Sequence, residues 1–227
     1  MNKVMSPSVA IKKVKSGDTI MVGGFGLVGA PLTLIEELLK HDSYDLTVIS
    51  NNLGEPGVGL GKLLRQGKIK KAIGSYFTSN REVGDYYLQG KIQIELLPQG
   101  TLAESIRAGG AGIGGYYTKT GAGTELAKGK ETREIDGELF VLEKPLRANV
   151  ALIKAHKADR LGNLVYYKTA RNFNPIMATS ADYCIAEVDE IVETGELNPE
   201  EIVTPHLYVD AIVLSAYTLT KEGVVPR

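Results

Sequence analysis

The chain has 227 residues, of which 43% are hydrophobic, and its 26 basic and 27 acidic side chains leave a formal net charge of -1. This near balance gives no electrostatic argument for nucleic acid or an anionic membrane as a partner. The one cysteine, Cys184, excludes an internal disulfide, and no apolar run approaches the ~18 residues of a membrane span. We therefore expect one globular domain over residues 1–227 that lies in the cytoplasm.

Apolar, β-branched runs alternate with helix-like segments over residues 1–110. Helical spacing is clearest in "PLTLIEELLK", where Pro31 suits a first helical position, and Gly67 and Gly90 suit the ends of two further helices. This alternation predicts a doubly wound α/β part with an open, mainly parallel sheet and helices on its faces. Its strands are expected at 19–24, 45–50, 69–76 and 91–98.

The composition of the sequence changes after residue 110. Residues 109–129 are too rich in glycine for a helix or a central strand, so an extended excursion is expected there. The turn residues of "DRLGN" (159–163) predict a hairpin. Residues 111–227 are therefore expected to add a mostly antiparallel lobe to the same domain, with strands at 137–143, 149–159, 163–168, 184–192 and 207–215.

The first predicted strand-to-helix turn contains a literal G-x-G-x-x-G at Gly24, Gly26 and Gly29. A dinucleotide site of this kind also needs an acidic residue at the end of the second strand, to bind the ribose hydroxyls. That strand ends in Asn51-Asn52 instead. The missing acid weakens the interpretation of this turn as the dinucleotide site of an oxidoreductase. The glycines could equally serve only the tight packing of the turn.

Other catalytic motifs are missing from the sequence. A P-loop would need glycine at 56 and serine or threonine at 63, where Pro56 and Leu63 stand, and no Cys or His pair has metal-ligand spacing. The dispersed histidines are expected to be surface or strand residues. Cys184, in "DYCIAEV", is expected to be a buried and unreactive thiol. The three histidines are His41, His156 and His206.

Polar residues follow the predicted strands at the edge where open α/β sheets bind ligands. Asn51 and Asn52 follow the second strand, and "PQGT", which includes Gln99, follows the fourth. Singly, such residues commonly form turns and helix caps. Together they suit a thioester carbonyl or the oxyanion formed when it is attacked, but they cannot be the nucleophile. The pattern suggests an acyl or carboxylate site that lacks its own catalytic residue.

A family resemblance rests on longer stretches. "DTIMVGGFGLVGAP" resembles the signature of the family I coenzyme A transferases. Segments spread over about residues 3 to 215 are similar to the A (alpha) subunit of 3-oxoacid and acetate/acetoacetate CoA-transferases. The resemblance implies a CoA-transferase-like fold, related to the sugar-phosphate isomerase-like fold. The additional segments are "VISNN", "PQGTLAESIRAGGAGIGGYYTKTGAGT", "KADRLGNLVYYKTARNFNP" and "AEVDEIVETGEL".

The resemblance also implies a chemistry. Such enzymes move CoA between two carboxylic acids of short-chain fatty acid and ketone body metabolism, by a ping-pong route through a glutamyl-CoA thioester. The glutamate belongs to a Ser-Glu-Asn-Gly motif of the beta subunit, and this sequence has no such string. CoA or acyl-CoA would then be a substrate, with no permanently bound cofactor and no metal, and the chain would work in a hetero-oligomer.

Site residues are implied in the same way. Asn51, Asn52 and Gln99 would support catalysis and face the partner's glutamate and the acyl group. Val28 and His206 depart from the residues common in oxoacid-transferase relatives, so the resemblance does not carry a substrate preference over to this chain. Two alternatives stay open: a nicotinamide-dependent oxidoreductase and a non-enzymatic small-molecule-binding domain. The resemblance assigns CoA binding to the loop of Gly23, Gly24, Phe25, Gly26, Leu27, Val28 and Gly29.

Overall fold

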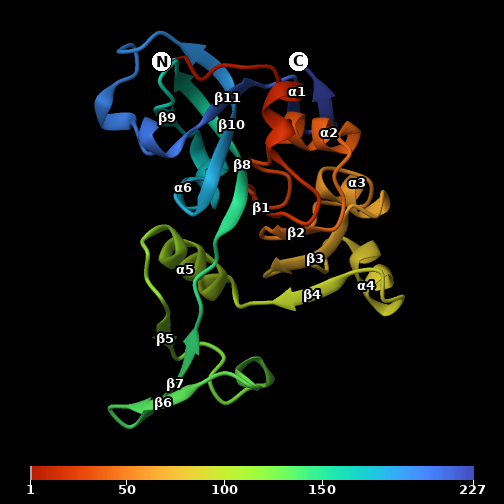
Figure 1. Ribbon diagram of the computed structural model, residues 1–227, viewed down its shortest axis with the longest axis vertical. Helices are drawn as coiled ribbons and strands as arrows, with labels where there is room; N and C mark the ends of the chain where they lie inside the picture. Colours follow the sequence, from red (N-terminus) through yellow and green to blue (C-terminus); the bar gives the residue numbers. More distant parts are fainter. Residues whose placement is uncertain (1) are drawn as a thin grey trace.

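A computed structural model describes residues 2–227 and contains one large sheet (Figure 1). The strand order is β11-β10-β8-β1-β2-β3-β4, with β9 paired to β8. Every pair along this order is parallel, which confirms the predicted parallel sheet. The strands are β1 (Thr19–Val22), β2 (Leu46–Ile49), β3 (Ile69–Gly74), β4 (Gln93–Leu96), β8 (Ala148–Asp159), β9 (Leu164–Val165), β10 (Ala181–Val192) and β11 (Ala211–Leu214).

Helices cover both faces of this sheet. Successive residues of β1 point to opposite sides: Ile20 belongs to the buried cluster under α1 to α4, and Met21 to the cluster under α5 and α6. Figure 1 shows α1 to α4 on one side of the strands, and α5 and α6 on the other. The predicted doubly wound arrangement is therefore present. The helices are α1 (Pro7–Ala10), α2 (Leu32–Lys40), α3 (Leu60–Arg65), α4 (Arg81–Leu88), α5 (Gln99–Gly110) and α6 (Asn174–Ala178).

The ends of the early helices largely follow the sequence. Gly67 and Gly90 have φ values of 67° and 69°, the left-handed conformation that ends a helix. Pro31 is not the first helical residue as predicted, because α2 begins at Leu32 and Pro31 precedes it as the N-cap. Gln99 and Thr101 do not cap α5, because both lie inside that helix, which begins at Gln99.

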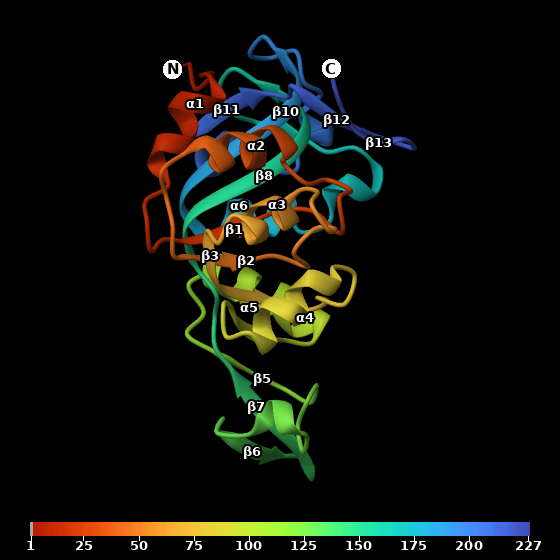
Figure 2. The same cartoon turned by 90° about the vertical axis from the view of Figure 1, so that its right-hand side faces the viewer.

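Antiparallel sheets lie within residues 111–227, as predicted, and one of them contains the strand expected at 137–143. Residues 116–143 contain β5 (Tyr116–Thr118), β6 (Thr132–Ile135) and β7 (Glu138–Glu143), a three-stranded sheet that projects from the body as an arm (Figures 1 and 2). A hairpin of β12 (Tyr217–Thr220) and β13 (Gly223–Pro226) forms the other.

The expected position of the later long strands, in an antiparallel lobe, is wrong. β8, β10 and β11 extend the main sheet in parallel instead. The connection from β8 to β10 contains no long helix, only β9, a short 3-10 turn and α6 of 5 residues. A helix of that length is too short to produce the 3.6-residue periodicity that reveals a parallel crossover in a sequence.

The predicted hairpin at 159–163 is confirmed. Ala158 pairs with Leu164 across it in an antiparallel ladder. One carboxylate oxygen of Asp159 accepts hydrogen bonds from the backbone N–H groups of the turn, at 2.9 to 3.1 Å. This local satisfaction of backbone donors by an aspartate is why "DRLGN" turns.

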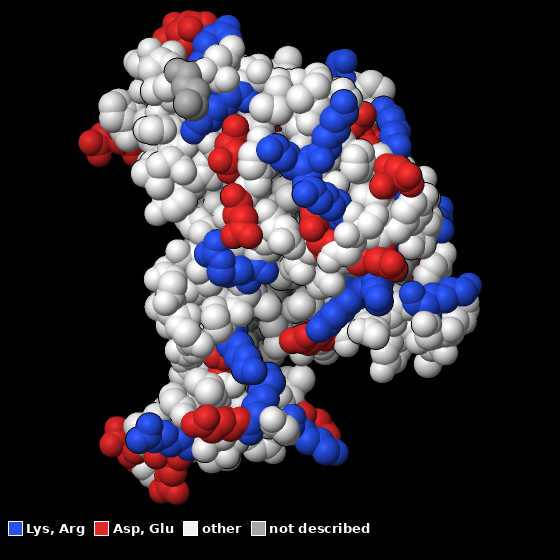
Figure 3. Space-filling model, in the orientation of Figure 1, with Lys and Arg blue, Asp and Glu red and all other residues white. Residues whose placement is uncertain are grey.

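The surface carries both signs of charge side by side over the face shown in Figure 3, in keeping with the net charge of -1. Among residues 2–227, no helix has the length and apolar character needed to cross a bilayer. The same residues contain no group of three or more His, Cys, Asp or Glu side chains arranged to bind a metal ion.

Candidate active site

The glycine-rich segment after β1 forms a tight hairpin turn, which we call the first loop (residues 24–29). Phe25 and Val28 exchange two backbone hydrogen bonds of 2.9 and 3.2 Å. Gly26, the first central residue of the turn, has a φ of 61°, a conformation that favours glycine. Within the described chain, the N–H groups of Gly26, Leu27 and Gly29 have no acceptor. The loop thus presents unpaired backbone donors at the carboxyl edge of the sheet.

Asn172 fastens the first loop to the segment after β9. Its side-chain oxygen accepts the N–H of Gly24 at 3.2 Å, and its side-chain nitrogen donates to the carbonyl of Val28 at 3.0 Å. Asn172 has a φ of 20° and therefore lies at the border of the left-handed region, which asparagine tolerates better than most residues. A single side chain therefore holds both ends of the turn.

Asn174 is completely buried and completes this attachment. Its Nδ2 donates to the carbonyls of Gly29 and Ala170 at 3.0 and 2.8 Å, and its Oδ1 accepts the N–H of Lys154 at 2.9 Å. A Cβ on Gly23 would overlap Asn174 Oδ1. The glycine at 23 is therefore required by the close approach of this asparagine.

Three polar residues from three strand ends meet beside the loop. Asn51 follows β2, Ser75 follows β3, and Gln99 begins α5 after β4. Asn51 Nδ2 lies 3.0 Å from Ser75 Oγ and 3.2 Å from Gln99 Oε1, both within hydrogen-bond distance. Asn51 is buried, whereas Gln99 is exposed. The structure thus brings Asn51 and Gln99 together as the sequence suggests, with Asn51 on the buried side of Gln99.

Asn52 follows β2 and faces the small cavity between the first loop and residues 54–60. Its Oδ1 accepts the N–H of Gly54 at 3.1 Å, as the predicted turn at this site requires. Its Nδ2 has no acceptor within the described residues. A Cβ added to Gly26 would lie 4.0 Å from this nitrogen, so Asn52 is next to the first loop. A small cavity of about 10 Å³, enough for a single water, separates the two segments and is also lined by Asn51.

The segment after β2 repeats the geometry of the first loop, and we call it the second loop (residues 54–59). Glu55 and Val58 exchange backbone hydrogen bonds of 3.3 and 3.0 Å, as Phe25 and Val28 do. Here Pro56 precedes Gly57, whose φ is 69°, the order expected of a type II turn. The two loops are neighbours, because a Cβ on Gly59 would come 3.0 Å from Leu27.

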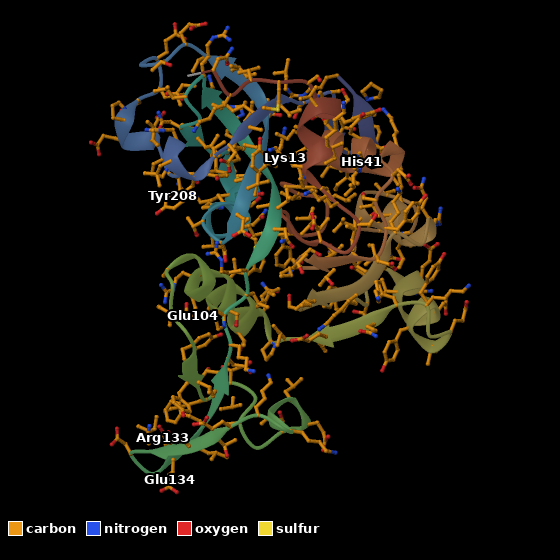
Figure 4. All side chains as sticks on the ribbon, in the orientation of Figure 1. Lys13, His41, Glu104, Arg133, Glu134 and Tyr208 are labelled. Atoms are coloured by element: carbon orange, nitrogen blue, oxygen red, sulfur yellow. The ribbon has the colours of Figure 1, made fainter. Side chains whose placement is uncertain are left out.

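Among residues 2–227, no carboxylate forms a hydrogen bond with the side chains of Asn51, Ser75 or Gln99. Glu104 pairs with Arg107 at 2.7 Å on α5. The side chain of Glu187, on β10, is fully buried and accepts the N–H groups of Thr33 and Leu34, at the start of α2. Figure 4 shows that Glu104 lies on α5 and Glu134 far out on the arm. These acids thus lie on a helix, a strand and the arm, away from the hydrogen bonds of the cluster.

The remaining reactive side chains also lie outside the cluster. Burial raises the pKa of the Cys184 thiol far above its usual range, so this cysteine is unreactive, as predicted. His156 lies on β8, where its Nδ1 is 3.2 Å from Asp189 and its ring centroid is 5.2 Å from that of Tyr167, with the two rings tilted by 39°. The cluster of amides and backbone donors can therefore stabilise negative charge on an oxygen but cannot attack a carbonyl.

Several of these contacts could not be predicted from the sequence. Ser75, Asn172 and Asn174 are not predicted as site residues, because their contacts join strand ends and segments up to about 150 residues apart. The second loop does leave a signal. Gly24, Val28 and Gly29 recur 30 positions later as Gly54, Val58 and Gly59.

Known proteins resemble this chain over most of its length. The A subunit of the succinyl-CoA:3-ketoacid coenzyme A transferase of Helicobacter pylori is 52% identical over 213 residues, covering 93% of this chain and 92% of the relative. The A subunit of the 3-oxoadipate CoA-transferase of Pseudomonas putida is 52% identical over 206 residues, covering 90% and 89%.

A solved structure shares the fold. The acyl-CoA transferase of Escherichia coli O157:H7, crystallised as a thioester complex with CoA, superposes with a TM-score of 0.83 at 22% identity. The match covers 94% of this chain, which spans about half (47%) of that longer chain. The family model described as coenzyme A transferase matches residues 4–215. This chain therefore belongs to the coenzyme A transferase family.

Proposed function

We propose that this chain is the A (alpha) subunit of a CoA-transferase that moves CoA between an acyl-CoA and a short-chain carboxylic or 3-oxo acid. The observation that carries the proposal is the cluster of Asn51, Asn52 and Gln99 beside the first loop: it offers hydrogen-bond donors but no nucleophile. Half an active site is what one subunit of a two-subunit enzyme would contribute. The names of the 52% identical relatives, both of them A subunits, support this assignment.

The reaction proceeds by covalent catalysis in two halves. A glutamate of the partner, in its Ser-Glu-Asn-Gly motif, attacks the thioester carbonyl and expels CoA as a thiolate. The thiolate then attacks the glutamyl carbonyl of the resulting anhydride, which releases the first acid and leaves glutamyl-CoA. The second acid reverses these steps. Each attack creates an oxyanion, and one well-placed donor lowers such a barrier by about 2.7 to 4 kcal/mol.

The residues of this chain serve that chemistry without entering it. The exposed Gln99 faces the acyl group together with Asn52, while Asn51 supports Gln99 from behind. The backbone of residues 23–29, with its unpaired N–H groups, approaches the thioester end of CoA, because glycines leave room for close contact. CoA enters and leaves as a substrate, with no resident cofactor, and the enzyme works in the cytoplasm.

Exposed apolar side chains mark the face that the partner covers. Phe25 and Val28 of the first loop are 48% and 42% exposed, and Tyr76 and Leu96, after β3 and at the end of β4, are 55% and 50% exposed. All four lie at the carboxyl edge of the sheet, beside the polar cluster. Apolar groups gathered around a polar site are typical of an interface between subunits.

The test is a CoA-transfer assay on this chain reconstituted with a beta subunit that carries Ser-Glu-Asn-Gly, across a panel of short and 3-oxo acids. Borohydride reduction of the acyl-CoA-treated complex should label one glutamate, in the partner. A labelled glutamate in this chain would overturn the proposal. Strong fluorescence change on titration with NADH, and no CoA transfer, would favour the oxidoreductase alternative instead.

A further inference from the structure

The Asn51–Ser75–Gln99 cluster has a fixed donor pattern. Asn51 Nδ2 carries two hydrogens and has two acceptors, Ser75 Oγ at 3.0 Å and Gln99 Oε1 at 3.2 Å. Ser75 Oγ also lies 3.4 Å from the backbone carbonyl of Asn51 and 3.5 Å from Gln99 Oε1, so its one hydrogen is placed between these two acceptors. The three side chains therefore form a closed triangle in which both N–H groups of Asn51 are used.

Asn51 is held where it is by its backbone. Its carbonyl accepts the N–H groups of Ser75 and Tyr76 at 3.1 and 3.0 Å, which ties the end of β2 to the end of β3. The residue is 1% exposed, and its Oδ1 has no hydrogen-bond partner in the part of the chain that the structure describes. In the structure this buried amide directs Nδ2, and not Oδ1, at Ser75 and Gln99.

This arrangement decides which end of the Gln99 carboxamide is free. The oxygen and nitrogen ends of a glutamine side chain have nearly the same shape but opposite hydrogen-bonding roles. Because Oε1 faces the Asn51 donor, Nε2 is the end without a partner within residues 2–227, on an exposed side chain. An oxyanion requires a donor, and the opposite orientation would present an acceptor to it.

We infer that Ser75 is a positioning residue, which together with Asn51 fixes the Gln99 carboxamide so that its Nε2 donates toward the reacting carbonyl. The inference rests on the role of Gln99 in the proposed function. Ser75 is not itself a nucleophile, because among the described residues its hydroxyl contacts only Asn51 and Gln99 and no base that could take its proton.

A double-mutant cycle on the reconstituted two-subunit enzyme tests this. Gln99→Ala should lower kcat about 100-fold. Ser75→Ala should lower kcat about tenfold in the wild-type background, with KM for the acyl-CoA unchanged, and less than twofold in the Gln99→Ala background. Ser75→Thr, which keeps the hydroxyl, should restore most of the loss. An equal loss with and without Gln99 would overturn the inference and leave the proposed function standing.

Asn51→Asp is a second, independent variant. The new carboxylate cannot donate to Gln99 Oε1, so the carboxamide should turn over and present its oxygen to the substrate, and kcat should fall at least as far as in Gln99→Ala. Melting temperature and association with the partner confirm folding of each variant. Activity of Asn51→Asp within threefold of wild type would contradict the inference. A harmless Gln99→Ala would instead refute the proposed role of Gln99 itself.

Discussion

The first and second loops share a backbone form but are held in different ways. Each contains a four-residue turn closed by two backbone hydrogen bonds, and each lies at the carboxyl end of its own strand. The first is fastened by Asn172 and Asn174, which lie about 150 residues further along the chain. The second is fastened by Asn80, which donates to the carbonyl of Leu53 at 3.0 Å, and by packing against Arg65.

The second loop is therefore held by residues close to it in the sequence, whereas the first loop is held by residues far from it in the sequence. The hydrogen bond that holds the second loop, and the ion pair beside it, come from residues 53–82, close to the loop in the sequence. The first loop is held by hydrogen bonds from Asn172 and Asn174, in the segment after β9. The loop that we assign to CoA therefore depends on the C-terminal half of the chain, and substitutions at its distant supports should be the more damaging.

Gly23→Ala should give the largest effect. A Cβ there would overlap Asn174 Oδ1, and moving this side chain would break the four hydrogen bonds that its Oδ1 and Nδ2 make. We therefore expect a loss of about 3 kcal/mol in unfolding free energy and of nearly all transfer activity. Gly26→Ala is the matched control, because its site is open and only its φ of 61° is strained, at about 1 kcal/mol. Urea unfolding measures both, and equal losses would contradict the steric account.

Asn174→Ala should come next, at about 2 to 3 kcal/mol. The change leaves the carbonyls of Gly29 and Ala170 and the N–H of Lys154 without their partner in a buried site. Asn198→Ala, at an exposed 3-10 turn, is the control and should cost well under half as much. In the reconstituted enzyme, Asn174→Ala should raise KM for acyl-CoA. An unchanged KM with a normal melting curve would show that the first loop does not need this support.

Asn80→Ala tests the local support of the second loop and should cost about 1 to 2 kcal/mol. It removes the hydrogen bond to Leu53 and the N-cap of α4, where Asn80 Oδ1 accepts the N–H of Glu82 at 3.2 Å. Since the side-chain hydrogen bonds of the first loop come from Asn172 and Asn174, and not from Asn80, KM for acyl-CoA should change little. A KM increase as large as that of Asn174→Ala would mean that both loops contact CoA.

The sequence predicted the parts of the fold that have local causes. The strand runs, the glycines after α3 and α4 and the "DRLGN" hairpin each depend on residues within a few positions of one another. The parallel placement of β8, β10 and β11 could not be predicted in that way, because the crossovers between them contain only short helices. Their position is decided by burial against the rest of the sheet.

The candidate site likewise has residues that could be predicted from the sequence and residues that could not. Asn51, Asn52 and Gln99 could be found because parallel strands bring their carboxyl ends to one edge, so position in the sequence predicts position in space. Ser75 stands at the same edge, but a serine after a strand is too common to single out. The asparagine pair that shapes the first loop had no local signal, since its effect is exerted across the fold.

The smallest expected effect concerns the acids beside the two loops. Burial raises the pKa of Asp189, but hydrogen bonds from Lys154 and His156 and the charges of Lys154 and Arg227 outweigh it, and the net pKa is lowered. The pKa of Glu82 is lowered by its hydrogen bond and ion pair with Arg65. A lowered folded-state pKa stabilises the protein above the unfolded value, near pH 4, and that stabilisation is lost as pH falls through the folded value.

Asp189→Asn should therefore destabilise the protein by about 1 kcal/mol at pH 7, and the difference from wild type should shrink as the pH is lowered from about 5 toward about 3. Glu82→Gln should follow the same trend with a smaller decrease in melting temperature, because its ion pair is exposed to solvent. The measurement is Tm against pH for the three proteins. Because Lys154 joins Asp189 to Asn174, loss of the charge at 189 should weaken the first loop more than loss of the charge at 82 weakens the second. A pH-independent difference for both variants would show that neither acid contributes through its charge.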